Sequence, residues 1–199
     1  MDSETNGMPP PVEGERASLY ALVIYLPDPV GIFLDKLRLE MAPGCNPHAH
    51  VSVLPPRPLP VEPEAAIEEA RAILEVFPPF DIELGGIEKF AATDVVYISV
   101  KEGAEQLRRM HGSLNRDAMA FAEPFAYHPH VTVAQEIKDP ARVEELLGLG
   151  ARRWREFQGP RCFRAETAVF VRNIRGNIWR DLANGKLRGT ANSPMPGLD

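Results

Sequence analysis

The spacing of apolar positions separates strands from helices in the first half of this chain. Apolar runs at 18–26 and 95–100, and the partly alternating segment 80–90, predict strands. Over 30–41 and 63–77 the apolar residues instead recur every three or four positions, which is typical of amphipathic helices. This half therefore mixes strands with helices that each have one apolar face.

The second half repeats this order of elements. Helical spacing predicts helices at 103–121 and 139–150, with a short strand expected at 130–134 between them. Two more strands, at 162–174 and 177–182, are separated by an Arg-Gly turn and are expected to form a hairpin.

A short motif occurs once in each half, as HVSV at 50–53 and HVTV at 130–133. Side chains alternate between the two faces of a strand, so His50 and Ser52 share one face, and His130 and Thr132 share one face in the second copy. Valines occupy the other face in both copies. Because the second histidine follows the first by 80 positions, the sequence predicts an internal repeat of that length.

The repeat predicts an α+β fold that is bilobal, with two pseudo-symmetric β-α-β-α-β units whose antiparallel sheets surround a central groove. The domain is expected to cover 18–183. The ends, 1–17 and 184–199, are poor in large apolar residues and are predicted to be flexible tails. In this arrangement the two motif strands face each other across the groove.

Composition limits the class of partner. The chain has 199 residues and 44% hydrophobic residues, enough for one core, and 22 Lys and Arg against 28 Asp and Glu give a net charge of −6. This balance argues against binding long nucleic acid, which needs many basic contacts to phosphate. The two cysteines form no C-x-x-C pair, and no apolar run is long enough to span a membrane. We expect a cytoplasmic protein with no membrane partner.

Two imidazoles and two hydroxyls around one groove suit phosphodiester chemistry. An unperturbed histidine has a pKa of about 6.5, so near neutral pH one ring can accept a proton while another donates one. The Ser52 and Thr132 hydroxyls are expected to donate hydrogen bonds to the non-bridging phosphate oxygens. This chemistry requires no metal ion or other cofactor.

The paired motifs resemble those of the two-histidine (2H) phosphoesterases, a superfamily that includes 2'-5' RNA ligase-like proteins and RNA 2',3'-cyclic phosphodiesterases. Its members carry one H-x-[ST]-x motif on a strand of each lobe. The resemblance implies that His50 and His130 are the acid and the base, and that Ser52 and Thr132 contact the phosphate. It also implies a substrate that is an RNA end or a small nucleotide with a 2',3'-cyclic phosphate or a 2'-5' linkage, and catalysis without a metal.

Several neighbours of the motifs are further candidates for contact with the substrate. His48 and His128 each precede a motif histidine by two positions, and Tyr127 precedes His128. These three are predicted to bind substrate or support the site, although an aromatic residue such as Tyr127 can equally belong to the core. Gln135 stands where many RNA-processing relatives carry an arginine, so this chain lacks that cation beside the second motif.

Three other polar residues have less specific expectations. Arg57 and Arg172 are candidates for contact with phosphate. His111 lies in a predicted helix next to Gly112 and is expected to be exposed or to act at a helix end.

Two other functions fit the same residues. Four histidines in two H-x-H pairs could converge on Zn²⁺ and make a metal-dependent hydrolase. A module that binds a nucleotide or phosphate without turning it over would also use the groove. The sequence leaves open the physiological substrate, the direction of reaction, which histidine is the acid, and the oligomeric state.

Overall fold

Along the described chain, strands alternate with helices except at β3–β4 and at β6–β7–β8, where strands follow one another directly. The structure, a computed structural model, describes residues 19–46, 48–176 and 178–190. A short 3-10 turn follows the third helix at Asp117–Met119. The elements in chain order are β1 Tyr20–Tyr25, α1 Val30–Met41, β2 His50–Arg57, α2 Pro63–Leu74, β3 Phe80–Lys89, β4 Val96–Glu102, α3 Ala104–Leu114, β5 His130–Ala134, α4 Pro140–Glu156, β6 Cys162–Ala165, β7 Thr167–Arg175 and β8 Ile178–Lys186.

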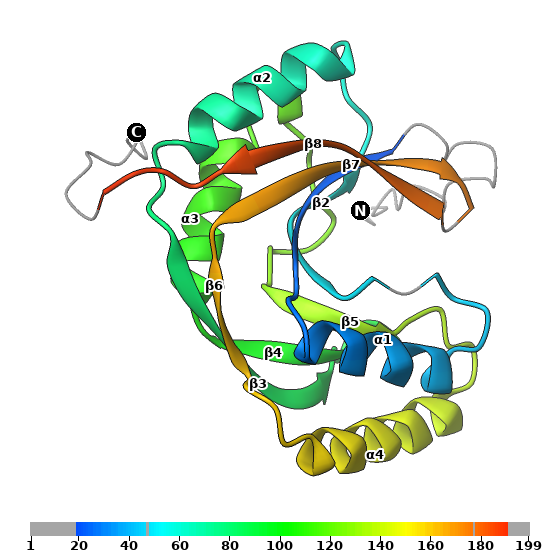
Figure 1. The fold of residues 1–199 in the computed structure, drawn as a ribbon. Helices are drawn as coiled ribbons and strands as arrows, with labels where there is room; N and C mark the ends of the chain where they lie inside the picture. The colour runs from blue at the N-terminus through cyan, green and yellow to red at the C-terminus, as the bar shows by residue number, and fades with distance from the viewer. Residues whose placement is uncertain (1–18, 47, 177, 191–199) are drawn as a thin grey trace, which may run out of the picture.

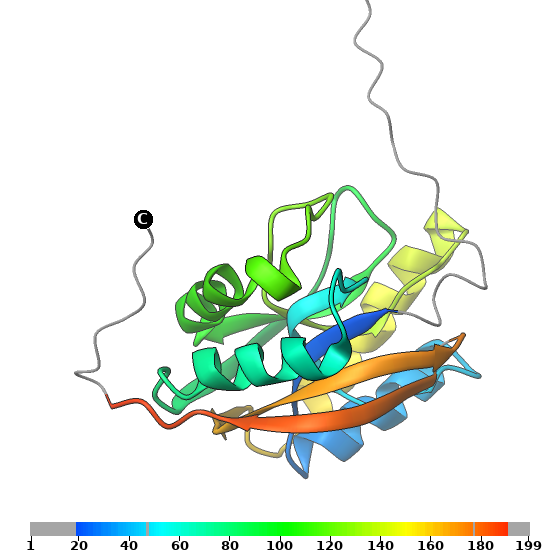
Figure 2. The ribbon, with the colours of Figure 1, turned by 90° about the horizontal axis from the view of Figure 1, so that it is seen from above.

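The strands form two four-stranded sheets, in the orders β2-β1-β7-β8 and β5-β4-β3-β6. We call these the first and the second sheet; every strand pair in them is antiparallel. Helices α2 and α3 pack on the first sheet, and α1 and α4 pack on the second (Figure 1). Viewed from above, α2 runs alongside the β7–β8 hairpin (Figure 2). The predicted α+β fold with two antiparallel sheets is confirmed.

Each sheet takes strands from both halves of the chain. β3 follows the first motif strand in sequence but pairs with β4 and β6 in the second sheet, whereas β7 returns to pair with β1 in the first sheet. The single strand predicted at 162–174 is therefore two strands in different sheets, with the break at Glu166. Helix α1 also crosses over, because it follows β1 and packs against β5. The two lobes are joined by exchanged elements.

The apolar face of each motif strand builds the core between these layers. Val51 and Val53 of β2 and Val131 and Val133 of β5 are all at most 1% exposed and belong to one large apolar cluster. A one-residue slip of either strand would turn its valines away from the core, so their burial fixes the strand register. The motif histidines and hydroxyls are consequently held on the opposite face.

Helix α3 ends earlier than the pattern of the sequence predicts. It stops at Leu114. The Asn115 side chain then accepts a hydrogen bond from the Phe121 amide at 2.9 Å and donates one to the Phe121 carbonyl at 3.2 Å. A side chain that bonds the backbone in this way competes with helix continuation. The segment that follows forms the 3-10 turn and a loop.

Other element ends extend beyond the predicted ones. α4 continues to Glu156, where buried Trp154 donates its indole N–H to the Gly85 carbonyl at 2.7 Å. β8 continues to Lys186, and Leu187 after it is buried, so ordered structure reaches past 183. The predicted tail at 1–17 and the last residues of the chain lie outside the described residues. No helix in the described ranges is both long and apolar enough to cross a membrane.

Candidate functional site

Strand β2 holds the first motif beside β1. His50 lies opposite Tyr25, and Ser52 lies opposite Val23 in the antiparallel register. His50 Nδ1 lies 2.6 Å from the carbonyl oxygen of His48. A carbonyl can only accept, so Nδ1 carries a proton and donates to it, and the lone pair of the neutral ring is then on Nε2. The backbone before the strand thereby fixes the tautomer of His50.

Strand β5 repeats this arrangement beside β4. His130 lies opposite Ser99, and Thr132 lies opposite Tyr97. His130 Nδ1 donates to the carbonyl oxygen of His128 at 2.6 Å, the same contact over the same two-residue interval. The two motif strands also contact each other directly. The backbone therefore presents both imidazoles in the same tautomer on neighbouring strands.

Burial keeps both motif histidines uncharged at neutral pH. It lowers the pKa of His50 from 6.5 to about 4, and the positive charges of Arg38, His48 and His130 push it in the same direction, against the hydrogen bond to the His48 carbonyl. Burial also lowers the pKa of His130, with a further contribution from the charge of His128. Because the charge of His130 acts on His50, the structure brings the two motif histidines within electrostatic range of each other.

An aromatic ring fixes the residues around His50. The Tyr25 ring stacks on His48 with centroids 3.6 Å apart and planes at 6°, and it meets His50 edge-on at 6.3 Å. The Tyr25 hydroxyl donates to Asp181 Oδ1 at 2.7 Å. Burial, followed by this carboxylate, raises the pKa of Tyr25 well above its usual range. Tyr25 is therefore a neutral hydrogen-bond donor that braces both His48 and His50.

Two aromatic rings surround His130 in the other lobe. Phe90 stacks on Tyr97 at 4.1 Å, and it meets His128 and His130 edge-on at 5.3 and 5.0 Å. The Tyr97 hydroxyl donates to Glu88 Oε2 at 3.1 Å. Sequence reasoning missed Tyr25 and Tyr97 as neighbours of the motifs. Antiparallel pairing of β1 with β2 and of β4 with β5 would have indicated them.

Tyr127 links the approach to the second motif with the strand of the first. Its hydroxyl donates to the Ser52 carbonyl at 2.8 Å, and its ring stacks on His111 with centroids 4.1 Å apart and planes at 3°. His111 lies in the last turn of α3, is 13% exposed, and contacts Glu123 Oε1 at 2.9 Å. These contacts use the hydroxyl and one ring face of Tyr127 within the protein. Its contact with a substrate stays a prediction.

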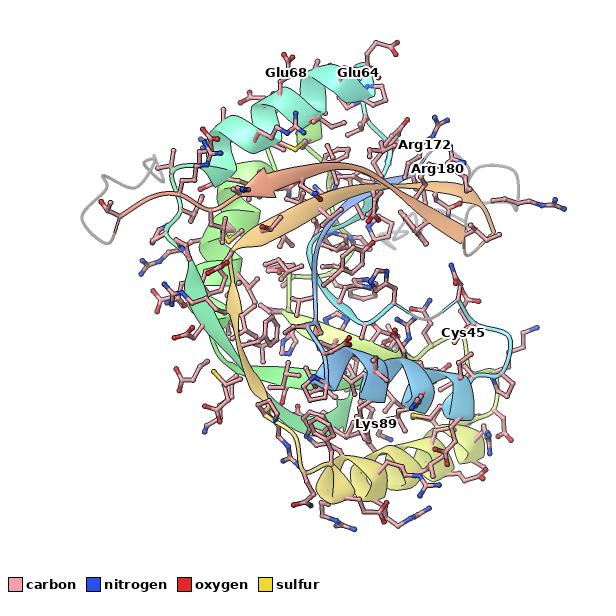
Figure 3. All side chains as sticks on the ribbon, in the orientation of Figure 1. Cys45, Glu64, Glu68, Lys89, Arg172 and Arg180 are labelled. Carbon is pink, nitrogen blue, oxygen red and sulfur yellow. The ribbon has the colours of Figure 1, made fainter. Side chains whose placement is uncertain are left out.

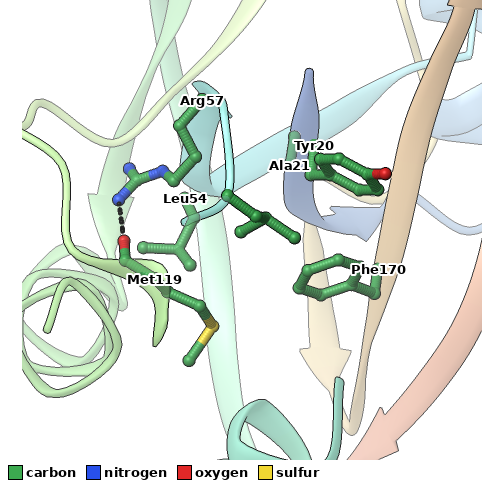
Figure 4. A pocket seen from close by; sticks show the side chains of 7 residues that line it. Tyr20, Ala21, Leu54, Arg57, Met119 and Phe170 are labelled. Atoms are coloured by element: carbon green, nitrogen blue, oxygen red, sulfur yellow. Dashed lines mark hydrogen bonds between the residues drawn. The ribbon is translucent and has the colours of Figure 1, made fainter. Parts of the chain in front are cut away.

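Arg57 is buried and fully engaged, so it is not placed to meet a phosphate. It is 1% exposed. It donates to Asn115 Oδ1 at 2.6 Å, to the Met119 carbonyl at 3.0 Å and to the Pro55 carbonyl at 3.0 Å, and it pairs with Glu123. Figure 4 shows it reaching the Met119 carbonyl beside apolar side chains of β1, β2 and β7. Arg57 holds the loop that follows α3.

Arg172 lies on the face of the first sheet that is opposite to His50. Its guanidinium stands 5.6 Å from the ring centroid of Tyr20, and Tyr20 packs in the main core, whereas Tyr25 packs on the other side of β1. Figure 3 shows Arg172 near Arg180, its partner across the β7–β8 hairpin. The prediction that Arg57 contacts phosphate is wrong, because Arg57 is buried and bonded within the protein. The predicted phosphate contact of Arg172, which lies on the opposite face of the sheet from His50, stays a prediction.

Arg38 is a cation near the motif that sequence reasoning missed. It lies in α1, whose residue Asp35 accepts a hydrogen bond from the Ala49 amide at 2.7 Å. This bond holds the helix against the segment that leads into His50. The only sequence signal for Arg38 is its position on a helix of otherwise amphipathic pattern, which does not separate a solvated arginine from one that faces a site.

The four motif-region histidines lie as two pairs with different neighbours. The His48 ring stacks on Tyr25, whereas the His128 ring meets Phe90 and Tyr97 edge-on. Across the ranges that the structure describes, no three His, Cys, Asp or Glu side chains are grouped so as to hold a metal ion. Both cysteines, Cys45 and Cys162, are free. Gln135, directly after β5, is exposed.

A cavity of about 590 Å³ lies beside the second motif. It is bounded by the β3–β4 turn and by the start of α4, and it includes Phe90, Lys89 and Thr93. Phe90, which lines this cavity, also meets His130 edge-on.

Solved structures with the same fold come from several organisms. Escherichia coli LigT complexed with 3'-AMP matches with a TM-score of 0.60 and 17% identity, covering 85% of this chain and 98% of that one. The same protein complexed with NADP⁺ matches at 0.58 and 15%, covering 86% and 98%. Usb1 of Kluyveromyces marxianus matches at 0.55 and 15%, covering 84% and 99%. At these identities the likeness shows a shared fold.

Sequence comparison gives the family. A protein of Bacillus cytotoxicus that is named as a candidate phosphoesterase is 27% identical in an alignment 128 residues long that covers 59% of this chain and 73% of that protein. The family model of the 2'-5' RNA ligase superfamily matches residues 26–177, more than half of the chain and both motif strands. The resemblance seen in the two motifs is thus confirmed, and this chain belongs to the 2'-5' RNA ligase superfamily of two-histidine phosphoesterases.

Proposed function

We propose that the protein is a metal-independent phosphoesterase that acts on a 2',3'-cyclic phosphate or a 2'-5' phosphodiester of RNA or of a nucleotide. Membership of the superfamily supports phosphoesterase activity in general. The observation that carries the finer proposal is the matched anchoring of His50 and His130. Each donates from Nδ1 to a backbone carbonyl at 2.6 Å, and each therefore keeps Nε2 for a proton exchanged with a ligand.

The charges around the two rings support an assignment of roles. Burial, and after it the charge of Arg38, disfavours protonation of His50, so His50 is the group that stays neutral and accepts a proton from the attacking water. Among the described residues, the charge that acts on His130 is that of His128, and we assign His130 as the proton donor to the departing ribose oxygen. A bound phosphate anion would raise the pKa of both rings and supply the protonated form that the acid needs.

The reaction balances with these two groups alone. Water loses a proton to His50 as its oxygen bonds to phosphorus, and the bond from phosphorus to one ribose oxygen breaks as that oxygen takes the proton of His130. The Ser52 and Thr132 hydroxyls lie on the same strand faces and donate to the non-bridging oxygens, where negative charge gathers. His48 and His128 complete the surroundings of the phosphate.

The size of the substrate follows from charge. A net charge of −6 opposes the binding of long nucleic acid, which leaves an RNA end or a small nucleotide as the partner. LigT, which has the same fold, has been solved with 3'-AMP and with NADP⁺. We therefore infer a nucleotide-sized substrate for this chain.

The test is hydrolysis of a 2',3'-cyclic mononucleotide and of an oligonucleotide with a 2',3'-cyclic end, each in the presence of EDTA. We expect turnover by the wild type in EDTA, and loss of turnover in both His50→Ala and His130→Ala. Thermal unfolding of each variant provides the control for folding. Activity that EDTA abolishes would support the metal-dependent alternative, and binding without turnover of either substrate would support the binding module.

A further inference from the structure

Helix α1 brings a positive charge to the first motif from outside the motif strands. Arg38 lies in the second half of this helix and is partly buried. Burial lowers the pKa of Arg38 because its charged form loses water. Asp35, three residues earlier and thus on the same helix face, is bonded to the Ala49 amide at 2.7 Å. This bond directs that face of α1 toward the segment immediately before His50.

The charge of Arg38 reaches the imidazole of the motif. It acts electrostatically on His50, and it also interacts with Asp35 and with Cys45 in the loop after α1, which is labelled in Figure 3. Within the described part of the chain, no hydrogen bond from its guanidinium and no ion pair at salt-bridge distance is formed. Asp35 acts on Arg38 only electrostatically, so the five N–H donors of this guanidinium are partly removed from water without a hydrogen-bonded anion.

The contrast with Arg57 shows what is unusual about Arg38. Arg57 is fully buried, whereas Arg38 is half-buried, and the Arg57 guanidinium donates to Asn115, to two carbonyls and to Glu123. A protein that buries a guanidinium normally supplies it with such partners, because an unpaired buried charge is costly. Arg38 is half-buried without such hydrogen-bonded partners, and its charge acts on His50 of the first motif.

We propose that Arg38 binds the reacting phosphate of the substrate, as a guanidinium supplied by α1 beside His50. This inference rests on the proposed function for the nature of the anion. A planar guanidinium suits two phosphate oxygens at once, and the bound anion would provide the pairing that Arg38 lacks. Arg38 then acts together with Ser52 and Thr132 in holding the negative charge.

The position of Arg38 near the first motif also affects the protonation of His50. While the site is empty, its charge helps to keep His50 in the neutral form that accepts a proton. When phosphate is bound, the anion offsets that charge. Removing the guanidinium should therefore weaken phosphate binding and also raise the pKa of His50 toward its ordinary value.

The first test is the affinity of the full chain for inorganic phosphate, measured by calorimetry for wild type, Arg38→Gln and Arg38→Lys. We expect Arg38→Gln to bind about 10- to 100-fold more weakly, the loss of a charge-assisted contact, and Arg38→Lys to lie between it and the wild type. Lys36→Gln is the matched control, since it removes one positive charge from an exposed position of the same helix and should change affinity less than twofold, about 0.4 kcal/mol.

The second test is the titration of the His50 imidazole by NMR in the same variants. We expect its pKa to rise in Arg38→Gln and to stay unchanged in Lys36→Gln. Wild-type protein that does not bind phosphate, or an Arg38→Gln variant with unchanged affinity, overturns the proposal. Phosphate binding that depends on Arg38 without turnover of any cyclic nucleotide would overturn the proposed function and leave this inference standing.

Discussion

His50 and His130 occupy the same position in the two copies of the motif, yet different groups surround them. His50 lies near the charge of Arg38 and beside a tyrosine bonded to Asp181. His130 lies against the ring edges of Phe90 and Tyr97, with His128 as the positive charge that acts on it. Both keep the same hydrogen bond from Nδ1 to the backbone.

This comparison separates two properties that a catalytic histidine needs. The repeat preserves the contact that orients each ring and fixes its tautomer. It varies the charges around the ring, which set how readily the ring takes a proton. A duplicated unit can thus supply two histidines that share the same orienting hydrogen bond and differ in pKa.

Replacing either motif histidine should give the largest effect. We expect His50→Gln and His130→Gln each to lower kcat/KM by about 100- to 10,000-fold, the usual contribution of an acid or a base. In His50→Gln the remaining activity should lose its fall at low pH, and in His130→Gln it should lose its fall at high pH. The measurement is a pH profile of kcat/KM for each variant.

The assignment of His50 as the base and His130 as the acid also predicts the pH profile of kcat/KM for the wild type. Both pKa values lie below 6.5, with that of His50 at about 4, so the free enzyme should be most active on the acid side of pH 6.5. Identical profiles for the two variants would show that the rings are not differentiated as base and acid.

Acid should destabilise the fold through His50. Its pKa is 6.5 when unfolded and about 4 when folded, so the unfolded chain binds more protons between these values. The free energy of unfolding should be unaffected by His50 above pH 6.5 and should fall by at most about 3 kcal/mol as pH drops to 4. Denaturant unfolding at several pH values measures this, and His50→Gln should show a shallower fall. A parallel slope in the variant would contradict the lowered pKa.

The two motif hydroxyls should have nearly equal effects despite the different histidines. We expect Ser52→Ala and Thr132→Val each to lower kcat/KM by about 10- to 100-fold, since each removes a hydrogen bond to a charged oxygen. Ser52→Thr and Thr132→Ser retain the hydroxyl and serve as controls. A loss confined to one of the two positions would mean that the phosphate lies against one strand alone.

Tyr127→Phe should have the smallest effect and should act mainly on the first motif. It removes the 2.8 Å hydrogen bond to the Ser52 carbonyl and leaves the ring stacked on His111. We expect the free energy of unfolding to fall by about 0.5 to 1.5 kcal/mol. A substrate contact by Tyr127 would instead appear as a raised KM with little change in stability.

The motifs and most elements were predictable because local patterns determine them. The alternation around His50 and His130 places valines in the core and imidazoles on the other face, and that follows from strand geometry alone. The ends of α3 and α4 were not predictable in this way. Asn115 bonds to Phe121 after a turn, and Trp154 bonds to Gly85 far away in the sequence.

The charged parts of the site were also beyond sequence reasoning. Arg38 and Arg57 are both arginines in ordinary local contexts. The charge of Arg38 reaches His50 from α1, a helix that packs on the second sheet, and Arg57 is buried by partners that follow it by dozens of residues. Such placement depends on how the sheets pair, which a single sequence does not reveal.

The exchange of β3 and β7 between the sheets has an evolutionary reading. A single copy of the repeat, on its own, would leave β1 without the neighbour that β7 provides, and its own third strand would have no sheet to join. Two identical copies could satisfy each other by swapping that strand, as domain-swapped homodimers do. The described chain has the arrangement that joining the two subunits of such a dimer in one polypeptide would produce.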